Sequence, residues 1–281
     1  MRAYLAEFLS DPRVVNLPRI AWLPILYGIV LRTRPQKSAE KYAAIWSRDG
    51  SPLAFHTARQ AMLLSEALEL PVAHAMRYGD PTIASALQKL PNDDLTVVPL
   101  YPQYAESTTA SVADVLPRGV RMVREFHDHP GYIAALAAQV KRHWAAHGRG
   151  PMLLMSFHGL PKRGGQDYEK QCHATGRLLA GALSLKDTEW RVTFQSRFGF
   201  AEWLQPYTEP ILIQLAQNGF RRVDVFCPGF VSDCLETLEE MGIGARRRFL
   251  EAGGREFHLV SCLNEAPDWI AALAKIARGT V

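Results

Sequence analysis

A histidine follows a strand-like apolar segment in the middle of the chain. The run PMLLMSF over residues 151–157 is typical of a buried parallel strand, and His158, Gly159 and Pro161 come soon after it. Glycine and proline turn the chain, so we expect His158 at the strand's end. A neutral imidazole there can bind a metal ion or accept a proton near pH 7. The alternative is a histidine bonded to nearby backbone.

Three carboxylates follow another strand-like segment, RVDVFCPGF at residues 222–230. Asp233, Glu236 and Glu240 are spaced i, i+3 and i+7, which predicts that they share one face of a helix. A solvated acidic helix face is one interpretation, and Asp233 is also a candidate cap for the helix N-terminus. The position directly after a strand makes this stripe a second place where ligand chemistry can occur.

A third strand-like run, LTVVPLYP at residues 95–102, leads into Tyr101, Tyr104 and a hydroxyl-rich stretch at 107–111. One interpretation is a loop and a helix cap. The other is the wall of a pocket that accepts an aromatic ligand and offers hydroxyl donors to it.

These residues need elements to position them, and the sequence predicts alternating strands and helices. Further strand-like runs occupy 190–196 and 257–263, and helical patterns fill the intervals, several of them ending in glycine. This alternation favours an α/β fold with parallel sheets covered on both faces. Ligands of such sheets lie at the carboxyl ends of the strands, where the three candidate groups are expected.

Composition narrows the function class. The chain has 281 residues, of which 48% are hydrophobic and 21% charged, so it is an ordinary globular protein. A net charge of +4 fits an acidic small ligand or a membrane surface and is too small to indicate nucleic acid. The four cysteines form no CxxC pair, which favours reduced, buried thiols in a cytoplasmic protein.

The longest apolar run, IAWLPILYGIVL at residues 20–31, lies between Arg19 and the basic stretch RTRPQK. It is shorter than the roughly 20 residues that a membrane-spanning helix needs. It is therefore expected either to lie in the core or to meet a membrane surface or line an apolar pocket. The first residues lack the pattern of a signal peptide.

Other common chemistries find no support. HGLP is not a GxSxG nucleophile elbow, and no GxGxxG or Walker loop opens a helix after a strand. Nucleophilic catalysis and nucleotide binding are therefore not expected.

Long motifs in the chain resemble ferrochelatases over nearly the whole length. They are FLSDPRVV, KYAAIWSRDGSPL, MRYGDP, PLYPQYAESTTAS, SFHGLP, WRVTFQSRFGFAEWLQP and VFCPGFVSDCLETLEE, in the family's order. The resemblance implies two Rossmann-like α/β lobes with a porphyrin cleft between them. We expect the first lobe at 1–145, joined by a C-terminal helix at 263–281, and the second lobe at 146–262. The implied activity is the insertion of Fe²⁺ into protoporphyrin IX to make protohaem, the last step of haem synthesis.

The resemblance also implies roles for individual residues. His158 and Glu236 match the family's catalytic pair, with His158 accepting pyrrole protons and both able to hold iron. Asp233, Glu240 and Arg77 are implied on a proton or metal path. The implied porphyrin-binding residues are Arg34 and Lys37, which can pair with propionates, and Tyr42, Tyr101, Gln195, Ser196 and Trp203. The run 20–31 is similar to the family's apolar lip, so peripheral membrane contact is expected there.

Two departures from the family bear on these expectations. Family members carry an apolar strand before the helix with which this chain opens, which leaves the activity of the chain as given open. Some members hold a 2Fe–2S cluster, but only Cys262 lies near the C-terminus here, so neither a cluster nor any other bound cofactor is expected. The alternatives are a porphyrin or haem carrier without turnover and a related chelatase of the sirohaem or cobalamin pathways.

Overall fold

The larger sheet explains how the chain positions a site at one edge. In the computed structural model, which describes residues 1–91, 94–197 and 201–281, four parallel strands are arranged in the order β4-β3-β5-β6. Their bounds are β3 Leu153–His158, β4 Trp190–Gln195, β5 Arg222–Phe226 and β6 Glu256–Leu259. His158 pairs in register with Gln195, so the last residues of β3 and β4 lie side by side.

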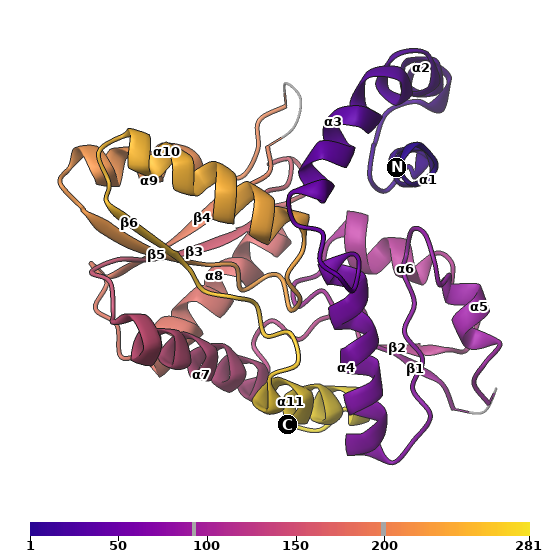
Figure 1. The fold of residues 1–281 in the computed structure, drawn as a ribbon. Helices are drawn as coiled ribbons and strands as arrows, with labels where there is room; N and C mark the ends of the chain where they lie inside the picture. Colours follow the sequence, from indigo (N-terminus) through magenta and orange to yellow (C-terminus); the bar gives the residue numbers. More distant parts are fainter. Residues whose placement is uncertain (92–93, 198–200) are drawn as a thin grey trace.

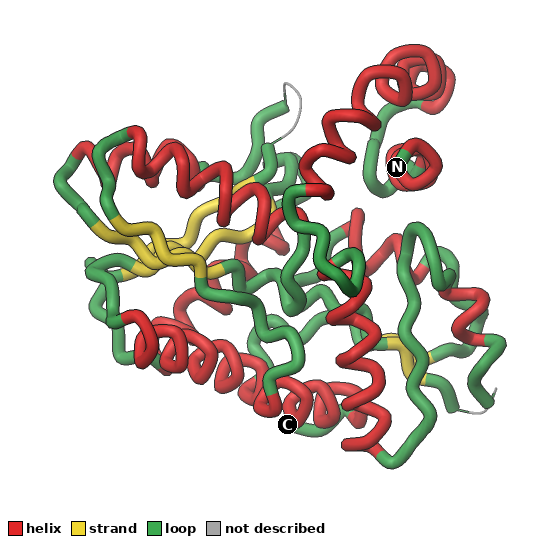
Figure 2. Tube along the Cα trace, viewed as in Figure 1, coloured by secondary structure: helices red, strands yellow, loops and turns green. Residues whose placement is uncertain are grey.

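Both faces of this sheet are buried, as near-continuous apolar strands require. Leu153, Met155 and Phe157 of β3 join one core with α7, α8 and α11, whereas Leu154 joins a second core with α9, η3 and α10. Figure 2 shows these strands in yellow between the two helical layers. The bounds are α7 Pro130–His147, α8 Gln166–Ala182, α9 Thr208–Gln217, π-helix η3 Glu236–Ala245, α10 Arg246–Glu251 and α11 Pro267–Arg278. The prediction of an α/β fold with parallel sheets is confirmed.

The first half of the chain has a smaller sheet. β1 (Thr96–Val97) pairs in parallel with β2 (Arg121–Met122). The predicted strand at 95–102 is thus paired over two residues only, and its prolines Pro99 and Pro102 cannot donate to a ladder. The neighbouring helices are α4 Pro52–Leu68, α5 Ile83–Leu87, π-helix η2 Glu106–Ala110 and α6 Ser111–Ala113.

The C-terminal helix joins the two halves. Its residue Trp269 is buried and donates from Nε1 to Oε1 of Gln60 on α4, at 3.0 Å. The same ring contacts Tyr132 of α7 at a centroid distance of 6.0 Å. In Figure 1, α11 lies between α7 and α4 at the bottom of the molecule. α11 is therefore part of the core that fixes the two sheets relative to each other.

The N-terminal helices project from the body of the molecule (Figure 1). They are α1 Arg2–Ser10, α2 Arg19–Ile25, π-helix η1 Leu26–Val30 and α3 Leu31–Ala43. Trp22 and Leu26 are buried in a small core of their own, whereas Ile20 is 93% exposed and Ile29 60% exposed. The apolar run 20–31 is therefore helical, with one side packed and the other side open.

In the described part of the chain, no helix combines the length and apolarity that crossing a membrane would require.

Candidate functional site

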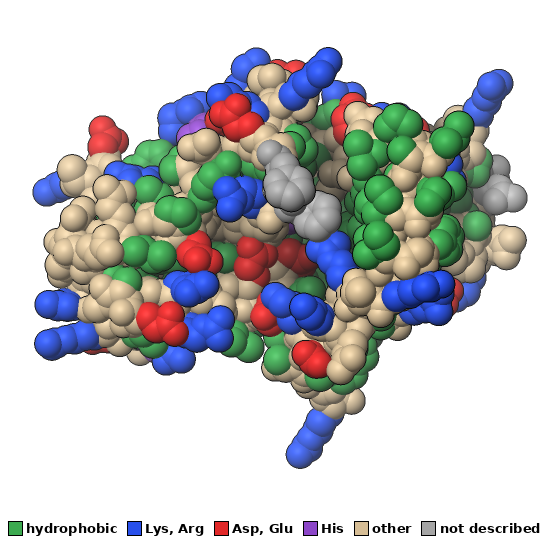
Figure 3. Space-filling model, turned by 90° about the horizontal axis from the view of Figure 1, so that it is seen from above, with side chains coloured by type: hydrophobic (Ala, Val, Ile, Leu, Met, Phe, Trp, Pro, Cys, Tyr) green, Lys and Arg blue, Asp and Glu red, His purple; other side chains and the backbone are tan. Residues whose placement is uncertain are grey.

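A large cavity opens between the two halves of the molecule, at the carboxyl edge of the larger sheet. Its volume is about 2830 Å³, well above the 300–1,000 Å³ of ordinary small-ligand pockets, so it has room for a macrocycle. It is lined by most of the predicted site residues, namely Arg34, Tyr42, Arg77, Tyr101, His158, Ser196, Trp203, Glu236 and Glu240. Seen from above, acidic side chains lie in a hollow beside a surface rich in hydrophobic side chains (Figure 3).

His158 is held at the end of β3 by its surroundings. Its backbone carbonyl accepts a hydrogen bond from the Tyr168 hydroxyl at 2.9 Å, and its Nδ1 lies 2.6 Å from the carbonyl oxygen of Gly159. A carbonyl can only accept, so we assign the proton to Nδ1. In the neutral imidazole, Nε2 then carries the lone pair that can take a proton or bind a metal ion.

Gly159 lets the chain turn next to His158. A Cβ at this position would lie 2.7 Å from the backbone oxygen of Gln195 and 3.3 Å from the Trp203 ring. Only glycine therefore permits this close approach of the loops after β3 and β4.

Glu240 lies on η3, and its carboxylate bonds to Ser196, the residue after β4. Its carboxylate accepts from the backbone N–H of Ser196 at 2.7 Å and from the Ser196 hydroxyl at 2.5 Å. Burial raises the pKa of Glu240, and the Ser196 hydrogen bonds and nearby His158 act in the opposite direction, while Glu236 adds to the rise. This places His158 and Glu236 each within electrostatic reach of Glu240.

Gln195 holds the start of η3, which carries Glu236 and Glu240, from behind the cavity wall. It is buried and donates from Nε2 to the backbone oxygen of Glu236 at 2.9 Å, while its Oε1 accepts from the Ser156 hydroxyl at 2.7 Å. Gln195 is absent from the cavity lining, and Ser196 is committed to Glu240. The structure thus places both residues as supports of the carboxylates.

The expectation that Asp233 shares a helix face with Glu236 and Glu240 is wrong. Asp233 lies in the turn before η3, and it does not line the cavity. Its buried carboxylate accepts from the Thr237 hydroxyl at 3.0 Å, from the Asn264 amide at 2.7 Å and from the backbone N–H of Cys262 at 3.3 Å. Asp233 therefore holds the helix start in place and lies outside η3, the π-helix that carries Glu236 and Glu240.

Aromatic side chains form part of the cavity wall. Tyr101 lines the cavity, and burial, reinforced by Tyr4 and Glu236, raises the pKa of its phenol to about 12. Burial, reinforced by the charge of Glu236, also raises the pKa of Tyr42. Trp203 lines the cavity with a buried Nε1 that has no hydrogen-bond partner among the described atoms. Residues 198–200 of the motif before Trp203 lie outside the described residues.

Tyr4 was missed by the sequence analysis. It lines the cavity, and burial, followed by the charges of Tyr42 and Glu236, raises its pKa above the usual range of a phenol. Its ring stacks on Phe8 one turn later, with centroids 6.0 Å apart. That i, i+4 aromatic pair on the first helix is a signal that the sequence offered.

The two residues of α3 expected to pair with propionates differ in position. Arg34 lines the cavity, whereas Lys37 is exposed outside its lining. On the next turn, Lys41 forms an ion pair with Glu239 of η3 at 2.7 Å, which joins the projecting helices to the second half of the molecule.

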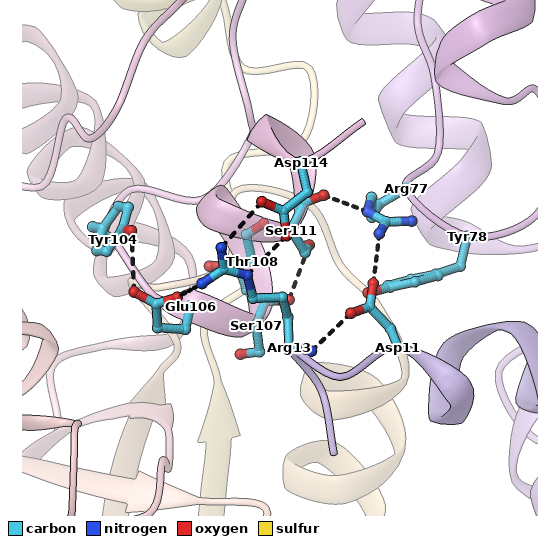
Figure 4. A network of polar contacts seen from close by, with 10 residues as sticks. All are labelled: Asp11, Arg13, Arg77, Tyr78, Tyr104, Glu106, Ser107, Thr108, Ser111 and Asp114. Atoms are coloured by element: carbon cyan, nitrogen blue, oxygen red, sulfur yellow. Dashed lines mark hydrogen bonds and ion pairs between the residues drawn. The ribbon is translucent and has the colours of Figure 1, made fainter. Parts of the chain in front are cut away.

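Arg77 belongs to a polar network at the base of the projecting helices (Figure 4). Its guanidinium pairs with Asp11, donates from Nε to the backbone oxygen of Ser111 at 2.7 Å, and lies over the Tyr78 ring at 4.5 Å. Nearby, Arg13 pairs with Asp114 and Glu106. Arg77 thus ties the loop after α1 to α6.

The described residues contain no ready-made group of three or more His, Cys, Asp or Glu side chains that could hold a metal ion. The four cysteines are buried and free, and burial raises the pKa of each thiol well above its ordinary value. A transient ligand set at the cavity therefore has to come from imidazole and carboxylate groups.

Known proteins resemble this chain over its whole length. The family model described as Ferrochelatase matches residues 1–281. A protein named ferrochelatase from Aromatoleum aromaticum is 55% identical over 303 aligned residues, which cover 100% of this chain and 83% of the relative. One from Azoarcus sp. is 54% identical over 297 residues, covering 99% of this chain and 82% of the relative.

Solved structures are similar in fold. CbiX, described as the terminal enzyme for the biosynthesis of siroheme in denitrifying bacteria, superposes with a TM-score of 0.57 at 15% identity, over 84% of this chain and 96% of that one. SirB from Bacillus subtilis with Fe³⁺ gives a TM-score of 0.56 at 15% identity, over 82% and 92%. At such identity the likeness establishes the fold alone.

Proposed function

The chain belongs to the ferrochelatase family, lyases that insert Fe²⁺ into a porphyrin to make protohaem, and we propose that His158, Glu236 and Glu240 carry this reaction. The observation that supports these three residues is that they line one macrocycle-sized cavity, where the carboxyl ends of β3 and β4 meet the first turns of η3. Iron and porphyrin are substrates, and imidazole with carboxylate binds Fe²⁺ weakly enough to release it.

The proton balance of the reaction assigns the roles. A metal-free porphyrin carries two pyrrole N–H protons, and both must leave before the ring nitrogens can hold Fe²⁺. The lone pair on Nε2 of His158 accepts such a proton. Glu240 has a raised pKa and interacts electrostatically with His158, so it is suited to take the proton onward. Glu236 supplies the second carboxylate, as a metal ligand or proton acceptor.

The cavity walls hold the ring. Tyr42, Tyr101 and Trp203 offer aromatic faces to a flat apolar macrocycle. Arg34 at the rim offers forked donors for a propionate, and Lys37 adds a point charge farther out.

Metal insertion tests the proposed function directly. The purified chain is mixed with protoporphyrin IX and Fe²⁺ or Zn²⁺ without oxygen, and the porphyrin absorbance is followed. We expect turnover. Binding of porphyrin without turnover would instead support a carrier, and an absence of both would contradict a working cleft in this chain.

The open side of the run 20–31 supports membrane contact. Ile20, Tyr27 and Ile29 are exposed, and Arg19 and Arg32 flank them. Apolar side chains next to basic ones favour an anionic membrane surface, from which a greasy porphyrin could enter the cavity. We therefore propose a cytoplasmic protein that binds membranes peripherally.

Vesicle binding checks this proposal. An Ile20→Asp/Ile29→Asp variant should bind vesicles containing anionic lipid at least about tenfold more weakly, because each substitution removes apolar area and adds a negative charge. Co-sedimentation with vesicles measures the effect, and Leu178→Asp, at an exposed leucine on α8, is the matched control. Equal sedimentation of all three proteins would contradict the proposal.

A further inference from the structure

An ion pair joins α3 to η3 beside the candidate site. Nζ of Lys41, in the last turn of α3, lies 2.7 Å from Oε2 of Glu239 on η3, and both residues line the cavity. Tyr42 is the next residue after this lysine, and Glu240 is the next residue after this glutamate. Burial and then the charge of Glu236 raise the pKa of Tyr42, so this phenol lies within electrostatic reach of the start of η3. The ion pair therefore lies where the segment carrying Tyr42 meets the helix carrying the candidate carboxylates.

Other contacts of the projecting helices are made with the first half of the molecule. Asp11 pairs with Arg77, and the carboxylate of Glu7 accepts from the backbone N–H of Gly79 at 3.0 Å. The helices also share a small core of their own, so we treat α1, α2, η1 and α3 as one unit. This unit is held to the first half through α1 and the loop after it, and Lys41 at the end of α3 ties it to the second half as well.

Burial makes this ion pair stronger than an ordinary surface pair. The side chain of Glu239 is only 16% exposed, whereas that of Lys41 is 54% exposed. Ion pairs between two exposed side chains contribute little, but a partly buried carboxylate is screened less by water and salt. Three of the first five residues of η3 are glutamates, so Lys41 supplies a positive charge where negative charges gather. The pair is thus placed to hold the end of α3 against the start of η3.

We propose that Lys41 and Glu239 are positioning residues for iron insertion, whose ion pair keeps Tyr42 at a fixed separation from the carboxylates of η3. This inference rests on the proposed function. A misplacement of about 1 Å can cost about 10²-fold in rate, so a tie between two parts of the cavity wall affects the catalytic step more than it affects binding of the ring. Neither side chain is required to touch the reacting atoms.

Insertion kinetics with protoporphyrin IX and Fe²⁺ test the proposal. Lys41→Met and Glu239→Gln should each lower kcat about tenfold and change the KM for porphyrin by less than about threefold. The double variant should be no slower than either single one, because both substitutions remove the same contact. Exchange of the charges, in Lys41→Glu/Glu239→Lys, should bring kcat back to within about threefold of the wild type. A raised KM in Lys41→Met together with wild-type kinetics in Glu239→Gln would make Lys41 a ligand of the propionates and overturn the proposal.

A distance measurement tests the ion pair without turnover. Spin labels on Gln36→Cys of α3 and Arg247→Cys of α10 report the separation of the two segments, since both positions are exposed and the four native cysteines are buried. We expect Lys41→Met to broaden the distribution of label distances and the charge exchange to narrow it again. An unchanged distribution in Lys41→Met would overturn the proposal. An absence of turnover in the unaltered chain would contradict the proposed function instead, because the label distances do not depend on it.

The matched control is an ion pair away from the cavity. Nε of Arg248 on α10 lies 3.2 Å from Oε1 of Glu209 on α9, and neither residue lines the cavity. Arg248→Met should therefore insert iron at the wild-type rate and leave the label distances unchanged. A similar loss of kcat in Arg248→Met would show that removal of any interhelical ion pair slows the enzyme, and it would remove the special role of Lys41 and Glu239.

Discussion

The His158→Ala variant should bind porphyrin and insert iron at least about a hundredfold more slowly than the wild type. General acid–base groups contribute about 10²–10⁴-fold to a rate. The alanine removes the imidazole at the carboxyl end of β3, which lines the cavity and interacts electrostatically with Glu240. The substitution leaves the backbone contacts of this position, because Tyr168 bonds the carbonyl of residue 158 and not its ring. Porphyrin absorbance gives the rate, and fluorescence quenching gives porphyrin binding.

His173→Ala is the matched control, because this histidine is half-buried on α8, against Phe194 of the same sheet, but lies outside the cavity lining. Its insertion rate should be close to that of the wild type. If His158→Ala inserted iron at the wild-type rate, the assignment of His158 as proton acceptor would fail. Loss of porphyrin binding together with turnover would instead assign His158 to holding the ring.

The carboxyl edge of the larger sheet was predictable from sequence. The apolar runs at 151–157, 190–196 and 222–230 contain mostly buried strands, and their length and pattern predict parallel strands. Because carboxyl ends of parallel strands meet at one edge, His158 and Ser196 follow neighbouring strands into the same cavity. The pattern of apolar runs thus predicts that the residues that follow these two strands lie close together.

The helix after β5 was not predictable in the same way. A 3.6-residue period predicts one acidic face, but η3 is π-helical, and Asp233 lies before it in a network with Asn264 and Cys262. That network depends on the loop after β6, which is 29 residues away from Asp233 at its nearest bond. Local spacing carries no information about such long-range partners.

Ion pairs between distant segments also escaped the sequence analysis. The Lys41–Glu239 ion pair and the Arg77–Asp11 pair join segments 198 and 66 residues apart. Either cation read alone is compatible with a ligand or a structural role, and only the tertiary arrangement shows which carboxylate it meets.

Glu240→Gln should insert iron about a hundredfold more slowly than the wild type, because the amide can neither accept a proton from His158 nor pass one on. It should also change how stability depends on pH. Burial raises the pKa of Glu240 in the folded protein above 4.5, the ordinary value of its carboxyl. Between the two values the folded state binds more protons than the unfolded state, so this carboxyl lowers the free energy of unfolding as pH rises.

Glutamine does not titrate and so lacks this penalty. The free energy of unfolding of Glu240→Gln, relative to the wild type, should therefore rise with pH from about 4.5 upward and level off above the folded pKa. Urea unfolding at a series of pH values measures the difference, and Glu251→Gln, at an exposed glutamate of α10, should show no such slope. A flat difference for Glu240→Gln would mean that this carboxyl titrates normally, and a wild-type insertion rate would remove it from the proton path. A rising difference together with slow insertion would show that the protein retains an unfavourably buried carboxyl because the reaction uses it.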